Sequence, residues 1–202
     1  MKTKKLIIAI LAFFGLATSV CAQVEGQEER IQRRAAEKVG QMNDYIKNMA
    51  DKTQDMKYRN RRKVKALNLF VARGYEYVED GVEKEGVQMQ VTSKNRAKIG
   101  QPLMRDYFDN LVGKKLDKIY TNVKIEATEV ADIKVSALRK LDDNMWECTC
   151  EYDQAFEGWR DGRPIYRDIT TKRIKCYVIA EQTEDGWEFI ILLGDVYAIK
   201  TR

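Results

Sequence analysis

The chain has 202 residues, with 36 Lys or Arg, 31 Asp or Glu and no His, which gives a formal net charge of +5. Histidine is the usual general base near neutral pH and a common metal ligand, so its absence excludes a Ser-His-Asp triad, a Cys-His dyad and a histidine-based zinc site. Catalysis by carboxylate, tyrosine or lysine side chains stays open. We expect no metal and no cofactor.

Residues 1–22 have the pattern of a signal peptide. A start with three lysines precedes an apolar run over residues 6–16, and Val20 and Ala22 place small residues before a cut at Gln23. The run is too short to cross the ~30 Å of bilayer hydrocarbon. We therefore expect an exported protein of bacterial type, periplasmic or secreted. A lipoprotein anchor at Cys21 is the less favoured alternative, because Gly, Ala or Ser usually precedes the lipidated cysteine and Val20 stands there.

Cleavage changes the charge balance. It removes three lysines and no acidic residue, which leaves 33 basic and 31 acidic residues and a net charge of +2. A mixed surface of this kind lacks the basic footprint of a nucleic-acid-binding protein. No later stretch is long and apolar enough for a transmembrane span.

Helical patterns fill the first half of the mature chain. Apolar residues recur at steps of three and four over about 27–56, within an N-terminal segment 23–58 that we expect to form an amphipathic helix. Further helices are expected over about 60–72 and, after Pro102, to about 112. A short strand is expected over 87–91, and residues 75–86 are predicted to be irregular.

The period changes to two in the second half. Alternation predicts strands at about 123–127, 133–137, 146–156, 165–181 and 187–199, with turns at Asp142–Asn144, Asp161-Gly162 and Asp185-Gly186. Residues 189–193 are apolar on both faces, which predicts a central strand. Helices that precede a run of antiparallel strands indicate an α+β fold, with N-terminal helices packed on a curved sheet of four to six strands.

Three cysteines remain after cleavage. A tight turn at Asp161-Gly162 would place Cys148 opposite position 175 or 176, so a Cys148–Cys176 disulfide is a candidate. The preferred interpretation is that Cys148, Cys150 and Cys176 are small buried apolar residues. The set lacks a fourth ligand for zinc.

This order of elements resembles the nuclear-transport-factor-2-like, or cystatin-like, superfamily over residues 59–202. The segments that carry the resemblance are KALNLF at 65–70, GVQMQV at 86–91 and LGDVY at 193–197, which are similar to exported proteins of gut Bacteroidetes. The resemblance implies a cone-like roll whose helices and curved sheet enclose a pocket.

The resemblance implies two kinds of function. The favoured one is a non-catalytic module of the bacterial envelope that binds a small ligand or a protein, with a homodimer through the sheet face as a further expectation. The alternative is a histidine-free isomerase or dehydratase that uses Asp and Tyr, but no spacing singles out one Asp–Tyr pair. Candidate ligand or interaction residues are Tyr152, Trp159, Tyr166, Asp195 and Tyr197. Trp159, expected in the hairpin loop, is either a recognition anchor or a side chain folded back on the sheet.

Overall fold

A computed structural model describes residues 26–95, 98–113, 119–184 and 186–202 of the protein. The predicted signal peptide, its cleavage site and Cys21 lie outside the described residues. Among the residues that are described, no helix is long and apolar enough to cross a membrane.

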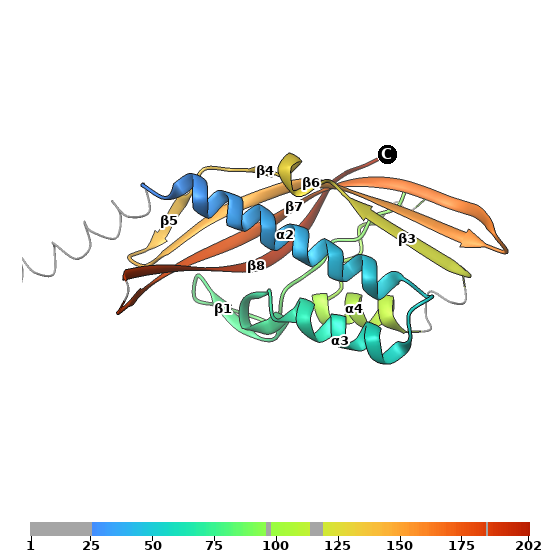
Figure 1. The fold of residues 1–202 in the computed structure, drawn as a ribbon, viewed down its shortest axis with the longest axis horizontal. Coiled ribbons are helices and arrows are strands. Elements are labelled where there is room, and N and C mark those ends of the chain that lie inside the picture. The colour runs from blue at the N-terminus through green and yellow to red at the C-terminus, as the bar shows by residue number, and fades with distance from the viewer. Residues whose placement is uncertain (1–25, 96–97, 114–118, 185) are drawn as a thin grey trace, which may run out of the picture.

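Three α-helices pack together on one face of a sheet (Figure 1). They are α2 (Glu28–Ala50), α3 (Met56–Leu67) and α4 (Met104–Val112). The buried face of α2 is a stripe at helical spacing that joins the main hydrophobic core: Ile31, Ala35, Val39, Met42, Ile46 and Met49. Glu28 and Glu29 lie in its first turn, where the helix dipole favours acidic groups.

A buried arginine joins the ends of the helices. Arg59 of α3 donates from Nε to the Met49 carbonyl at 2.7 Å and from Nη2 to the Leu111 carbonyl at 2.7 Å. These carbonyls belong to the last turns of α2 and α4, which lack partners within their own helices. One side chain, from the basic segment 57–65 (KYRNRRKVK), therefore supplies a partner to one carbonyl at each of the two helix ends.

The sheet is antiparallel and has six strands, with three very long ones. The strands are β3 (Asn122–Ala127), β4 (Lys134–Val135), β5 (Arg139–Asp142), β6 (Met145–Arg160), β7 (Arg163–Thr183) and β8 (Gly186–Thr201). Their order is β3-β6-β7-β8, and β4 and β5 also pair with β6. Short 3-10 helices lie at Val71–Gly74 and Val130–Asp132. The α+β fold class predicted from the sequence is confirmed.

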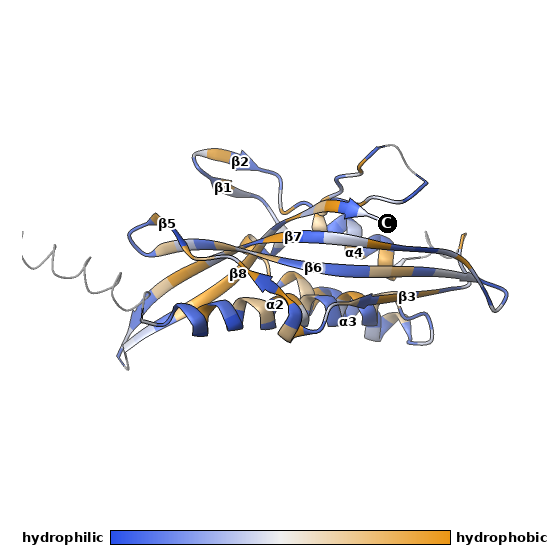
Figure 2. Ribbon diagram, turned by 90° about the horizontal axis from the view of Figure 1, so that it is seen from above, coloured by the Kyte–Doolittle hydropathy of each residue, from blue (hydrophilic) through white to orange (hydrophobic). Residues whose placement is uncertain are grey.

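The two faces of the sheet have different covers. The helices cover one face, called here the inner face, and a hairpin of β1 (Tyr77–Glu79) and β2 (Val82–Lys84) lies over the other, the outer face (Figure 2). This hairpin was not expected, because residues 75–86 have too few apolar side chains to show a strand period. Its turn places Asp80 and Gly81 at φ 50° and 76°, as a tight two-residue hairpin turn requires.

The position of β8 differs from the expectation. The apolar run 189–193 predicted a central strand, but β8 is the last strand in the sheet order. Along its second half, the edge away from β7 is paired by two isolated β-bridges, one between Leu193 and Phe70 and one between Val196 and Met89. Its first half has β7 as its neighbour on one side and no strand on the other among the described residues. The prediction of a central strand was wrong because burial of both faces does not require a strand on both edges.

Candidate functional site

Three cross-strand pairs place polar groups on the inner face of β6 and β7. Tyr152 lies opposite Lys172, Gln154 opposite Thr170, and Phe156 opposite Asp168. All six side chains point to the helix-covered face, because opposite residues of an antiparallel pair share a face and positions two apart repeat it. We call these six residues the inner ladder. Its five polar members are buried, although most of the surrounding core is apolar.

Lys172 is the least expected member of the inner ladder. It is 5% exposed. Its Nζ lies 3.3 Å from Sδ of Met89 and 5.8 Å from the ring centre of Tyr107. No carboxylate of the described residues lies within ion-pair distance of it. Burial lowers the pKa of Lys172 to about 8, although the charge of Asp168 acts in the opposite direction.

Tyr152, opposite Lys172, is a second unsatisfied group. Its hydroxyl is buried and has no hydrogen-bond partner, and burial raises its pKa well above the ordinary value. Nearby on α2, Asn43 accepts a hydrogen bond from Gln154 at 3.2 Å, while its own Nδ2 has no partner. Of the three unpartnered buried side-chain atoms in the described part of the chain, two lie at this interface and the third is the Tyr77 hydroxyl. Buried donors without partners are costly, so each of them requires an explanation.

The other end of the inner ladder carries an acid. Asp168 accepts a hydrogen bond from the Tyr166 hydroxyl. That hydroxyl also lies 2.7 Å from Ser93 Oγ and accepts from the Lys94 amide at 3.1 Å, so residues 93–94 are fastened over this end. Four residues of strand separate Asp168 from Lys172, or roughly 13 Å between their Cα atoms. The two charges therefore mark opposite ends of the site.

Asp195 and Tyr197 do not belong to this site. Asp195 accepts from the Gln88 amide at 2.8 Å and from the Tyr197 hydroxyl at 3.5 Å, which fastens the segment around residue 88 to β8. On the same outer face, Glu79 of the hairpin accepts from Lys175 at 2.9 Å and from the Tyr177 hydroxyl. These groups are paired with one another, and their arrangement is that of a structural anchor.

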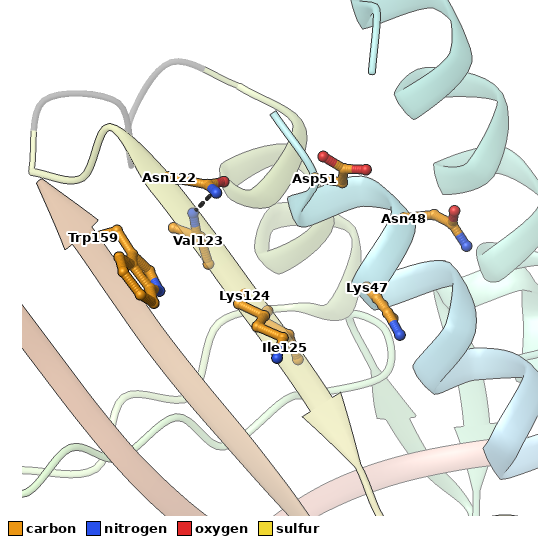
Figure 3. A pocket seen from close by; sticks show the side chains of 8 residues that line it. All are labelled: Lys47, Asn48, Asp51, Asn122, Val123, Lys124, Ile125 and Trp159. Carbon is orange, nitrogen blue, oxygen red and sulfur yellow. Dashed lines mark hydrogen bonds between the residues drawn. The ribbon is translucent and has the colours of Figure 1, made fainter. Parts of the chain in front are cut away.

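Trp159 lies on β6, opposite Pro164, and not in the hairpin loop. The side chain is half-buried and lines an open groove of about 400 Å³ between β3 and the end of α2 (Figure 3). The rest of the lining is Lys47, Asn48, Asp51, Asn122, Val123, Lys124 and Ile125. This groove contains none of the unpartnered polar groups, so the inner ladder is the stronger candidate for ligand chemistry.

The cysteines form a buried cluster. Cys148 lies directly opposite Cys176, and the sulfur of Cys150 is 3.7 Å from the sulfur of Cys176. All three are free thiols in the structure. The register needed for the Cys148–Cys176 disulfide is present, and the bond itself stays a prediction. Within the described residues no group of His, Cys, Asp and Glu could hold a metal ion.

The sequence indicated this site through strand alternation and not through a motif. Tyr152 and Tyr166 were candidates and are brought to the inner face, whereas Lys172, Gln154 and Asn43 were not singled out. Lys172 shares the parity of Ile174 and Cys176, so strand alternation places a charged residue on the apolar face. A charge at an inward position is a stronger indication of a site than an aromatic residue near a turn.

The similarity of this chain to known proteins is found in structure and not in sequence. No family model matches the chain, and no curated protein matches its sequence. Among solved structures, the chain is similar to a candidate scytalone dehydratase from Novosphingobium aromaticivorans, with 12% identity, a TM-score of 0.39 and coverage of 88% of this chain and 90% of that one. A hexachlorocyclohexane dehydrochlorinase has 11% identity, a TM-score of 0.36 and coverage of 86% and 89%. A candidate dehydratase of the NTF2-like family from Streptomyces avermitilis has 13% identity, a TM-score of 0.33 and coverage of 83% and 98%.

Proposed function

We propose that this protein is a non-catalytic binding module that holds a small organic anion, of the carboxylate class, against Lys172 between the sheet and the helices. The observation that carries the proposal is the buried Lys172 ammonium, which has a thioether and an aromatic ring as neighbours and no carboxylate. An unpaired buried charge is among the most costly groups in a folded protein. A ligand carboxylate would supply the missing partner.

The groups around Lys172 suit such a ligand. Tyr152 offers a hydroxyl donor that has no partner in the protein. Met89, whose Sδ contacts Lys172, has an unbranched side chain that can repack when a ligand enters. The apolar core on either side would receive the hydrocarbon part of the anion. Two donors beside an apolar core would suit the carboxylate and the hydrocarbon part of an amphipathic acid.

The proposal is tested with octanoate as the probe. We expect octanoate to raise the thermal midpoint of the wild-type protein in proportion to the logarithm of its concentration, because it binds the folded state alone. The variant K172M should lose this shift. The control is K175M on the same strand, whose lysine lies on the outer face and is paired with Glu79. An equal shift in wild type and K172M would contradict the proposal, as would the absence of any shift.

The natural ligand is identified by a separate experiment. Native mass spectrometry of protein purified from its own source would detect an anion that co-purifies with it. We expect such an adduct to be retained by wild type and lost from K172M. Protein that carries neither an anion nor a stable partner would weigh against the binding module.

Export is the second part of the proposal. The pattern of residues 1–22 supports a periplasmic or secreted protein that acts in the bacterial envelope, where its partner would be a small ligand or an envelope protein. The mass of the mature chain tests it, since cleavage predicts Gln23 as the first residue. A diacylglyceryl group on Cys21 would instead establish the lipoprotein alternative.

The homodimer through the sheet face stays a prediction. Cross-strand ion pairs occupy much of the outer face, for example Arg173 with Glu151 at 3.0 Å and Arg167 with Glu157 at 3.2 Å. A dimer there would bury polar side chains, in contrast to the apolar interfaces of stable homodimers. Sedimentation velocity over a range of concentrations distinguishes the two states.

A second function has one specific observation in its favour. The buried Asp168 carboxylate, hydrogen-bonded by Tyr166, has the residue types of a histidine-free isomerase or dehydratase. The carboxylate would take a proton from the carbon beside a carbonyl, the C–H electron pair would form a carbon–carbon double bond, the π pair of the carbonyl would move onto its oxygen, and Tyr166 would donate a hydrogen bond to that oxygen. Deuterium incorporation into cyclohexanone in D2O, faster with wild type than with D168N, would support this enzyme. Equal rates would leave the binding module as the sole proposal.

A further inference from the structure

The free edge of β8 is the second unusual feature of the fold. Trp187–Leu192 form its first half and end the sheet on that side. The β1–β2 hairpin overlaps this border in Figure 1, but it lies over the outer face in Figure 2 and its strands pair with each other. This half-strand therefore has an open edge in the described structure.

The backbone of this edge is oriented for pairing. The Leu193 amide donates away from β7, to the Leu69 carbonyl at 2.9 Å. Alternation then directs the N–H and C=O groups of Trp187, Phe189 and Ile191 to the same side. None of these three has a backbone partner on that side among the described residues. Natural proteins usually protect such edges with charge, proline or a cover, because an apolar edge pairs readily with other chains.

A groove with a basic wall runs along this edge. It has a volume of about 500 Å³ and is lined by Arg30, Arg34, Lys38, Asn68 and the half-strand itself. The three basic residues are four apart on α2 and so lie on one side of that helix. No acidic residue of the described chain forms an ion pair with any of them. The one acid in the lining is Glu188, whose parity in β8 is opposite to that of the buried Phe189 and Ile191.

We propose that this groove binds an extended acidic peptide segment of another protein, which adds to the sheet as a strand beside β8. Its backbone would pair with Trp187, Phe189 and Ile191. Its inner-face side chains, at every second position, would be acidic and meet Arg34 and Lys38. The side chains between them would be apolar and lie beside Ile190 and Leu192. Strand addition of this kind obtains affinity from the backbone and specificity from alternate side chains.

Charge and burial both favour this occupant. A second copy of the chain would bring a second basic wall against the first, which opposes self-pairing. Phe189 and Ile191 are buried, yet their backbone groups on the edge away from β7 have no partner among the described residues. The added peptide would pair this edge and make β8 an inner strand of the sheet.

The test uses an alternating glutamate–valine peptide and amide hydrogen exchange. We expect the peptide to slow exchange at Trp187, Phe189 and Ile191, and an alternating lysine–valine peptide to have no effect. Two N-methylated forms of the glutamate–valine peptide, blocked at odd or at even positions, separate strand pairing from charge attraction. One form should bind and the other should fail, because alternate amides of a strand point to opposite edges.

The protein variant is R34E, and R33E is its control. Arg33 is the neighbouring residue, with 72% of its side chain exposed and a contact to Glu37 at 3.9 Å. We expect R34E to weaken peptide binding at least about tenfold and R33E to change it little. Equal binding of both N-methylated forms, no binding of the parent peptide, or equal loss in R34E and R33E would overturn the proposal. Concentration-dependent protection of the edge without peptide would assign the groove to a second copy, and would overturn it too.

Discussion

Two lysines of one strand have opposite surroundings. Lys175 on the outer face of β7 is paired with Glu79 at 2.9 Å and lies 3.7 Å from Glu147. Partial burial would lower the pKa of Lys175, but the pairing with Glu79 outweighs it and raises the pKa. Lys172 on the inner face is more deeply buried and has no acidic partner at contact distance. The fold alone accounts for the charge of Lys175, because acidic side chains lie beside it. The charge of Lys172 either has a ligand as its partner or destabilises the folded protein.

The largest expected effect is that of K172M. Methionine keeps the length and removes the buried charge. The lowered pKa of Lys172 corresponds to about 3 kcal/mol of unfavourable charge burial at pH 7. We therefore expect the free energy of unfolding of K172M to be about 2 kcal/mol higher than that of wild type. Urea denaturation measures it. A destabilised K172M would show that the ammonium is satisfied within the fold.

The pH dependence has a definite sign. Below pH 8, Lys172 is protonated in both states, so the folded protein carries the full cost of the charge. Between about pH 8 and 10.5 the folded protein releases the proton while the unfolded chain keeps it, so the free energy of unfolding rises with pH. We expect wild type to approach K172M by about 2 kcal/mol between pH 7.5 and 9.5. Tyrosine ionisation contributes equally to the free energies of unfolding of wild type and K172M, so it cancels in their difference. A constant difference would be the contrary result.

On the outer face, removal of the lysine is expected to destabilise the protein and not to stabilise it. K175M removes the partner of Glu79 and leaves that carboxylate with Lys84 at 3.6 Å. We expect a loss of about 1 kcal/mol, limited by solvent screening of this half-exposed group. The double variant K175M/E79Q should recover part of the loss, since neither charge is then left alone. Stabilisation by K175M would remove the contrast between the two faces.

The smallest expected effect is that of Y152F. The variant deletes a hydroxyl that makes no hydrogen bond in the structure, so we expect the free energy of unfolding to stay within about 0.5 kcal/mol or to rise. Octanoate binding should weaken nevertheless. A clear loss of stability would indicate a partner for this hydroxyl within the folded protein.

Much of the fold could be predicted from the sequence. Alternation along residues 146–156 and the Asp161-Gly162 turn predicted β6, β7 and their register, because side-chain parity and turn chemistry are local properties. The edge position of β8 could not be predicted, because periodicity reports burial and not strand order. For the site, the parity of Lys172 was visible in the sequence. Its lack of a carboxylate was not, since Met89 and Tyr107 reach it from segments far away in the chain.

The most direct measurement is the ionisation of Lys172 itself, followed by NMR of side-chain-labelled lysine and assigned by comparison with K172M. We predict a midpoint near pH 8 in the free protein, because burial without a partner disfavours the charge. Octanoate should move this midpoint upward, since its carboxylate stabilises the ammonium. A midpoint near the ordinary lysine value that octanoate does not change would contradict the assignment of Lys172 as the anchor for an anion.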